Sequence, residues 1–106
     1  MTDDESFFKE QSLSIRFEVP SQDVAEGERL EKEGKWREAV DAYNKALGVD
    51  LRNAKAWWQL ANIYMRFDRK ADAVKCFESV VRLKPEAKAL AEWLESYKGQ
   101  GLAPRP

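Results

Sequence analysis

The sequence lacks histidine altogether and has a single cysteine, Cys76, which we expect to be a packed structural thiol rather than a redox switch. Histidine is the commonest general base and metal ligand, so its absence removes Ser-His and Cys-His nucleophile pairs. One cysteine without histidine supplies too few ligands for a structural zinc site and cannot form an internal disulfide. The 5 glycines fit neither dinucleotide-binding nor nucleotide-binding spacing. We therefore predict that the chain is not an enzyme and has no catalytic residue, metal site or cofactor.

Long hydrophobic runs and an excess of one charge are absent as well. No apolar run approaches the ~20 residues that a membrane helix needs, and the acidic start lacks the order of a secretory signal. Lys and Arg total 18 against 19 for Asp and Glu, so the domain is not basic enough to bind nucleic acid through phosphate neutralisation. These features predict a soluble, cytoplasmic domain with no nucleic-acid or membrane partner.

What the sequence does contain is an internal repeat. After a shift of 34 positions, residues 20–53 and 54–87 fall into register, with small residues opposite small ones and aromatic residues opposite aromatic ones. The matched pairs include Gly27 with Ala61, Ala39 with Ala73, and Tyr43 with Phe77. The period predicts two copies of one structural unit.

Each unit has the pattern of two helices. In the second unit Trp57, Leu60 and Tyr64 recur at the spacing of one helix face. Asn53 precedes them in the place of an N-cap, and Pro85 ends the unit's second helix because it cannot donate to the backbone ladder. With a further amphipathic stretch near the C-terminus, we expect five helices, at about 21–33, 37–48, 54–66, 70–83 and 86–98.

The second unit resembles the tetratricopeptide repeat signature. It reads Trp57-x-x-Leu60-Ala61-x-x-Tyr64, then Ala73-x-x-x-Phe77 and Pro85, with alanine in the usual glycine place. The first unit departs from the signature at Asp23, Glu26 and Leu51. The resemblance covers residues 20–98 and implies an all-α, right-handed solenoid of helical hairpins, with repeat one at 20–53, repeat two at 54–87 and a capping helix at 86–98. Residues 1–19 are then expected to form an N-terminal extended arm, and residues 99–106 a flexible tail.

The resemblance implies a protein–protein interaction adaptor that binds a segment of a protein or peptide partner in its concave groove. In this family the first helix of each repeat lines the groove. That rule assigns the groove to Lys55, Trp58, Asn62, Met65, Arg66, Val24 and Glu28. Trp58 is expected either to contact an external ligand or to be covered by the chain's own N-terminus.

One subclass of the family grips the C-terminal carboxylate of heat-shock chaperones with lysine, asparagine and arginine. None of the residues at the matching places fits this clamp, and a glutamate there would repel a carboxylate. The places hold Val24, Glu28, Gln59, Ala89 and Trp93. The sequence therefore argues against a chaperone-tail clamp.

The first twenty residues carry too many large apolar side chains for a solvated tail. Leu13, Ile15, Phe17 and Val19 alternate with polar residues, which is the period of a strand. Two repeats and one helix are also fewer than the ~3 repeats usually needed for a stable solenoid, so apolar edges need a cover. The arm is therefore expected to run along the repeat domain, to pair with its copy in a homodimer, or to dock on another protein. An alternative function stays open, that of a self-assembling structural module that dimerises through the arm or the open solenoid edge.

Overall fold

The computed structural model describes residues 21–99, and these residues form five helices and no strand. The helices are α2 (Gln22–Lys32), α3 (Trp36–Val49), α4 (Ala54–Arg66), α5 (Lys70–Leu83) and α6 (Lys88–Lys98). The all-α prediction is confirmed, with small shifts at some helix ends. None of the helices in this range is long and apolar enough to cross a membrane. The predicted arm residues Leu13, Ile15, Phe17 and Val19 lie outside the described residues.

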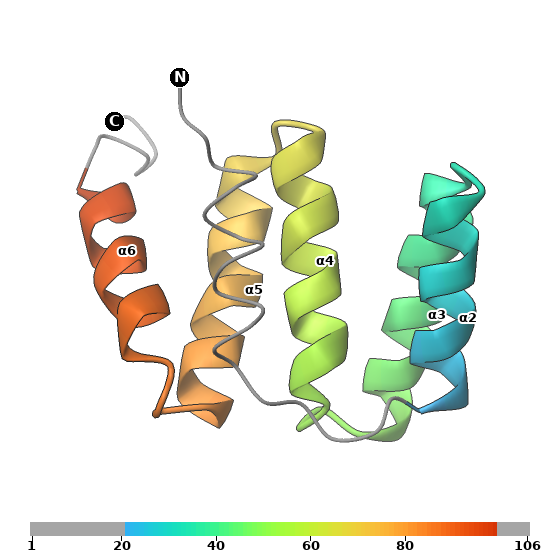
Figure 1. Ribbon diagram of the computed structural model, residues 1–106, viewed down its shortest axis with the longest axis horizontal. Helices are drawn as coiled ribbons and strands as arrows, with labels where there is room; N and C mark the ends of the chain where they lie inside the picture. Colours follow the sequence, from blue (N-terminus) through green and yellow to red (C-terminus); the bar gives the residue numbers. More distant parts are fainter. Residues whose placement is uncertain (1–20, 100–106) are drawn as a thin grey trace.

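Each helix packs against the next one along the chain (Figure 1). The turns from α2 to α3 and from α4 to α5 lie at the upper edge of the view, and the connections from α3 to α4 and from α5 to α6 lie at the lower edge. Successive helices are therefore antiparallel, and α2, α4 and α6 occupy the same place in successive units. This is the short solenoid of two helical hairpins and a capping helix that the repeat predicts.

Local hydrogen bonds account for where the helices begin. The side-chain oxygen of Asn53 accepts a hydrogen bond of 3.3 Å from the Ala56 N–H, so Asn53 is the N-cap of α4, as the sequence predicts. At the other end of repeat two, α6 begins later than predicted. The residues around Pro85 form a turn in which the Ala87 N–H donates to the Lys84 carbonyl at 2.9 Å, and this turn occupies the positions predicted to open the helix.

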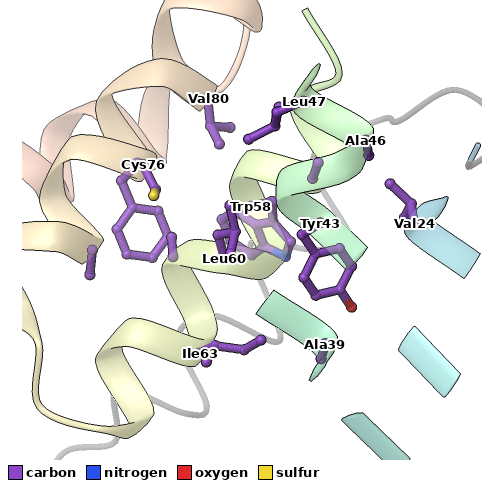
Figure 2. Close-up of a cluster of buried hydrophobic side chains, with 14 of the residues drawn as sticks. Val24, Ala39, Tyr43, Ala46, Leu47, Trp58, Leu60, Ile63, Cys76 and Val80 are labelled. Atoms are coloured by element: carbon purple, nitrogen blue, oxygen red, sulfur yellow. The ribbon is translucent and has the colours of Figure 1, made fainter. Parts of the chain in front are cut away.

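The buried side chains form one cluster that runs through both hairpins (Figure 2). Small residues let the paired helices approach: Ala39 and Ala73 are fully buried. Gly27 of α2 lies so close to the Tyr43 ring that an added Cβ would sit 2.5 Å from the ring's Cε1. The largest fully buried side chains are Tyr43, Phe77, Leu60, Leu90, Val24 and Val80.

Cys76 lies inside this cluster, on α5 next to Phe77. Burial raises the pKa of its thiol to about 12, and the charge of Asp72 adds to the shift. At neutral pH the thiol is therefore protonated, and it contributes to packing as a small apolar group.

Candidate partner-binding face

Helices α2, α4 and α6 form one side of the domain together, and side-chain contacts join them across it. Between α2 and α4, the Glu28 carboxylate lies 3.4 Å from the Lys55 ammonium and accepts a hydrogen bond of 3.1 Å from the Gln59 amide. Between α4 and α6, the Tyr97 hydroxyl donates to the Met65 sulfur at 3.8 Å. We call this surface the α2–α4–α6 face. It is the side on which the sequence places the groove.

A partly buried carboxylate and a phenol form the acidic end of the face, near α2. The Tyr43 hydroxyl donates to the Glu31 carboxylate and accepts a hydrogen bond of 3.4 Å from the Gln59 amide. Burial raises the pKa of Glu31, and the neighbouring charge of Glu28 raises it further. Burial and the bond to Glu31 also raise the pKa of Tyr43, so the phenol stays protonated as a donor.

Four aromatic rings form a continuous row across α4, α5 and α6. Trp58 meets Phe77 edge-to-face with 5.6 Å between ring centroids, and Phe77 meets Trp93 at 5.4 Å. Trp93 in turn stacks on Tyr97 at 4.7 Å. Aromatic contacts of this geometry stabilise the fold by more than the burial of ring surface alone would. Because Trp58 is only 3% exposed, its indole belongs to this row, and its contact with a partner stays a prediction.

An unsatisfied polar atom lies on α4 between the two ends of the face. Asn62 follows Trp58 by four residues and precedes Met65 by three, so the three side chains share one side of the helix. The side-chain oxygen of Asn62 is buried and has no hydrogen-bond partner among residues 21–99. Buried polar atoms are nearly always satisfied, and leaving one unpaired costs about 1–3 kcal/mol. Asn62 thus carries an acceptor whose hydrogen-bonding capacity is unused within the described part of the chain.

The predicted groove residues do not all share this environment. Val24 is fully buried in the core. The Arg66 guanidinium lies over the Trp36 ring at 4.7 Å from its centroid, and its charge also acts on Glu31 of the face. The others lie on the face or in its aromatic row, namely Lys55, Trp58, Asn62, Met65 and Glu28. Their roles in binding stay predictions.

Sequence reasoning missed the polar cluster around Tyr43. The repeat pairs Tyr43 with Phe77, and Gln59 enters the sequence comparison only as a residue that does not fit the carboxylate clamp. One signal was available, since the matched position in repeat two holds Phe77. A tyrosine hydroxyl in a fully buried position requires a hydrogen-bond partner, and that partner is Glu31.

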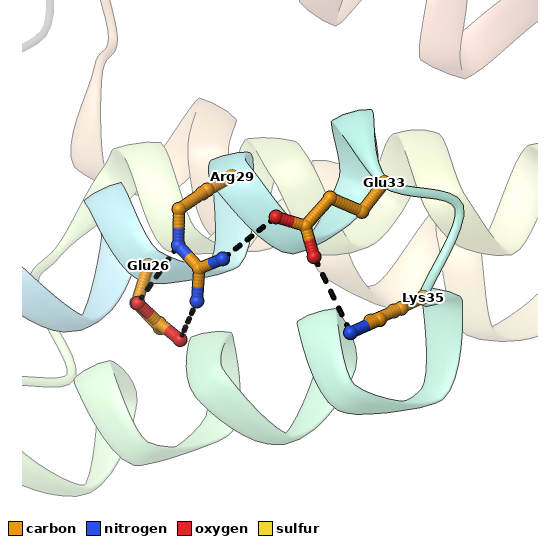
Figure 3. Close-up of polar contacts among 4 residues, drawn as sticks. All are labelled: Glu26, Arg29, Glu33 and Lys35. Carbon is orange, nitrogen blue, oxygen red and sulfur yellow. Dashed lines mark hydrogen bonds and ion pairs between the residues drawn. The ribbon is translucent and has the colours of Figure 1, made fainter.

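The α2–α4–α6 face offers charged, hydrogen-bonding and apolar groups. Within residues 21–99, no group of three or more His, Cys, Asp or Glu side chains is arranged to hold a metal ion. The ion pairs elsewhere on α2 are exposed and local, such as Arg29 with Glu26 and Glu33 (Figure 3). Exposed pairs of this kind contribute little stability, so they act mainly as a solvated surface.

Comparison with known proteins identifies the repeat. The family model for the tetratricopeptide repeat matches residues 24–88. The human protein O-mannosyl-transferase TMTC3 is 33% identical over 79 residues, which make up 74% of this chain and 9% of that protein. No solved structure gave a significant match. Tetratricopeptide repeats generally mediate protein–protein interaction and are not a catalytic fold. The chain belongs to the tetratricopeptide repeat family.

Proposed function

We propose that the α2–α4–α6 face binds a short segment of a partner protein, and that the chain acts as an adaptor. The observation that carries this proposal is the unsatisfied side-chain oxygen of Asn62. An extended segment lying along α4 would offer backbone N–H groups, and one of them would satisfy this acceptor. The cost of the unpaired oxygen in the free protein is then recovered on binding.

The charges on the face restrict what the segment carries. Glu28 and Glu31 lie side by side at the α2 end and their charges act on each other, so a further carboxylate there would be repelled. This supports an internal segment of the partner over a free C-terminal carboxylate. Toward α6 the aromatic row and Met65 favour apolar side chains.

The human relative does not bring an activity to this chain. Its name concerns the whole of that protein, of which the matched 79 residues are 9%. What the two chains share is the repeat, and we assign to this chain the binding role of the repeat alone.

The test compares two asparagine substitutions in the full-length chain. Asn62→Leu removes the orphan oxygen from the face, and Asn44→Leu makes the same change at an exposed position of α3. Each protein is used to capture partners from an extract of the native cell, with quantitative mass spectrometry as the readout. We expect a protein captured by the wild type and by Asn44→Leu that Asn62→Leu retains at least about tenfold less, the loss that 1.4 kcal/mol would produce.

A denaturant melt of the same three proteins separates binding from folding. Because Leu has a similar volume and removes an unpaired polar atom, Asn62→Leu should be as stable as the wild type or more stable. Equal capture by Asn62→Leu and Asn44→Leu would contradict the proposed role of Asn62 and of the face.

A further inference from the structure

A hollow of about 380 Å³ lies at the edge of the solenoid, beside the turn from α4 to α5. It belongs to neither the α2–α4–α6 face nor the polar cluster around Tyr43. Its walls come from the first turn of α3, the last turn of α4 and the turn that follows. The side chains used below are Trp36, Arg37, Val40, Tyr64, Phe67 and Arg69.

The floor of the hollow is apolar and partly open. Phe67, the C-cap residue of α4, is 50% exposed although it is a large aromatic side chain. Its ring meets Trp36 edge-to-face at 5.6 Å, and this contact covers only part of it. Val40 and Tyr64 are half-buried beside it. Exposed aromatic surface next to a concavity is the usual anchor point of an interaction site.

The rim of the hollow is cationic. Among residues 21–99, the charged side chains that line it are Arg37 and Arg69, and no acidic side chain of this range lines it. Arg69 lies 5.5 Å from the Tyr64 ring and is partly neutralised by Asp72 at 2.7 Å. Arg37 is exposed and forms no ion pair with any of residues 21–99. Charge complementarity at this rim therefore favours a carboxylate.

We propose that this hollow is a second docking site, which takes a linear partner segment with a bulky apolar side chain next to an Asp or Glu. The apolar side chain enters between Phe67 and Tyr64, and the carboxylate lies against Arg37. The volume is at the lower end of ligand pockets and suits one or two side chains. It is too small for the broad contact that two folded proteins need to form a stable complex.

The experiment uses a matched pair of small probes, 3-phenylpropionate and 3-phenylpropylamine, which share the ring and the chain and differ in the sign of charge. Each is titrated into the full-length ¹⁵N-labelled protein while the indole N–H signal of Trp36 is followed by NMR, assigned with Trp36→Phe. We expect saturable shifts with 3-phenylpropionate and a dissociation constant on the order of millimolar, as for fragments of this size. The amine should produce no saturable shift.

Variants locate the binding. Phe67→Ser and Arg37→Glu should each abolish the response to 3-phenylpropionate. Leu51→Ser, a change at a side chain that is 67% exposed at the opposite edge, should leave the response unchanged. Three results would overturn the proposal: no saturable shift with the carboxylate, an equal response to the amine, or an unchanged response in Phe67→Ser. A Trp36 signal that moves with protein concentration alone would assign the hollow to a second copy of the chain and would overturn it too.

Discussion

The two helical hairpins bury an aromatic ring at the same repeat position, but they surround it differently. In repeat one the Tyr43 ring lies against Gly27, and its hydroxyl is hydrogen-bonded to Glu31 and Gln59. In repeat two the matched ring is Phe77, which lies between two indoles in the aromatic row. The same fold thus accommodates a buried ring with polar neighbours in repeat one and a buried ring with aromatic neighbours in repeat two. The difference teaches that the close approach of the two helix backbones requires a small residue opposite the ring. The side chains that surround the ring are free to vary.

The hairpins also differ in what flanks them. Repeat two packs against α3 on one side and against α6 on the other, whereas repeat one packs against α4 on one side only, among the described helices. The predicted arm, residues 1–19, precedes α2 in the sequence and lies outside the described residues. This asymmetry makes the arm the candidate cover for the first hairpin and for the face.

The largest expected effect comes from removing that arm. Burial of three of its large apolar side chains would contribute roughly 4–9 kcal/mol before the entropy of ordering the segment is subtracted. We expect deletion of residues 1–19 to lower the midpoint of a denaturant melt. The same samples should show by light scattering either the loss of a dimer or increased aggregation.

The oligomeric state of the full-length chain distinguishes the proposed adaptor from the alternative, a self-assembling module. A full-length monomer supports the adaptor, and a dimer that is lost with residues 1–19 supports the self-assembling module. If the truncated chain keeps both the midpoint and the mass of the full-length chain, the arm is not part of the fold and its apolar residues are free to serve as a linear motif for another protein.

The next effect tests the close approach in repeat one. Gly27→Ala would place a methyl group within 2.5–2.8 Å of three Tyr43 ring carbons, so the buried ring or the helix would have to shift. We expect a loss of about 1–3 kcal/mol in the free energy of unfolding, measured by urea denaturation. The control is Gly48→Ala, at a glycine of α3 with open space around it, where the loss of backbone freedom in the unfolded chain should stabilise by about 0.5–1 kcal/mol. Equal effects of the two changes would show that the ring does not touch Gly27.

The turns within the hairpins provide a smaller test with opposite signs. Gly34 and Asp68 occupy matched places, and both have positive φ, 77° and 63°. A side chain other than glycine is strained in this region by about 1–2 kcal/mol. Gly34→Ala should therefore destabilise by about that amount, and Asp68→Gly should stabilise by up to about 1 kcal/mol, both read from melts. Two changes of the same sign would contradict the equivalence of the turns.

The smallest effect depends on pH. Because burial raises the folded-state pKa of Glu31 above its usual value, ionised Glu31 disfavours the folded state, and this penalty disappears as the pH falls through that raised pKa. Glu31→Gln keeps an acceptor for the Tyr43 hydroxyl without the charge. It should be more stable than the wild type at pH 7, with the gap in the free energy of unfolding closing as the pH is lowered through the raised pKa of Glu31. Glu38→Gln, at an exposed position, should show no such trend, and a gap that widens on acidification would refute the role of burial.

The sequence predicts the fold well and the site only in part. The repeat period and the matches of small residues with small residues establish the hairpins. Where the two helices of a pair come closest, only a small residue fits, such as Gly27 or Ala61. The site is harder, since phase on one helix cannot tell how far a side chain is buried. Val24 has the phase of the groove yet is fully buried. The unpaired state of the Asn62 oxygen and the hollow beside Phe67 depend on neighbours from other helices, which a single repeat does not encode.

The central claim is that the α2–α4–α6 face contacts the partner, and site-specific photocrosslinking tests it most directly. A photoreactive benzoyl-phenylalanine is introduced in the full-length chain at Met65, on the face, or at Asn44, an exposed position of α3 that is not part of it. After irradiation in a native extract, we expect one protein to be joined covalently to the chain from position 65 and not from position 44. Adducts of that protein from position 44 alone would place the binding surface on α3 and contradict the account.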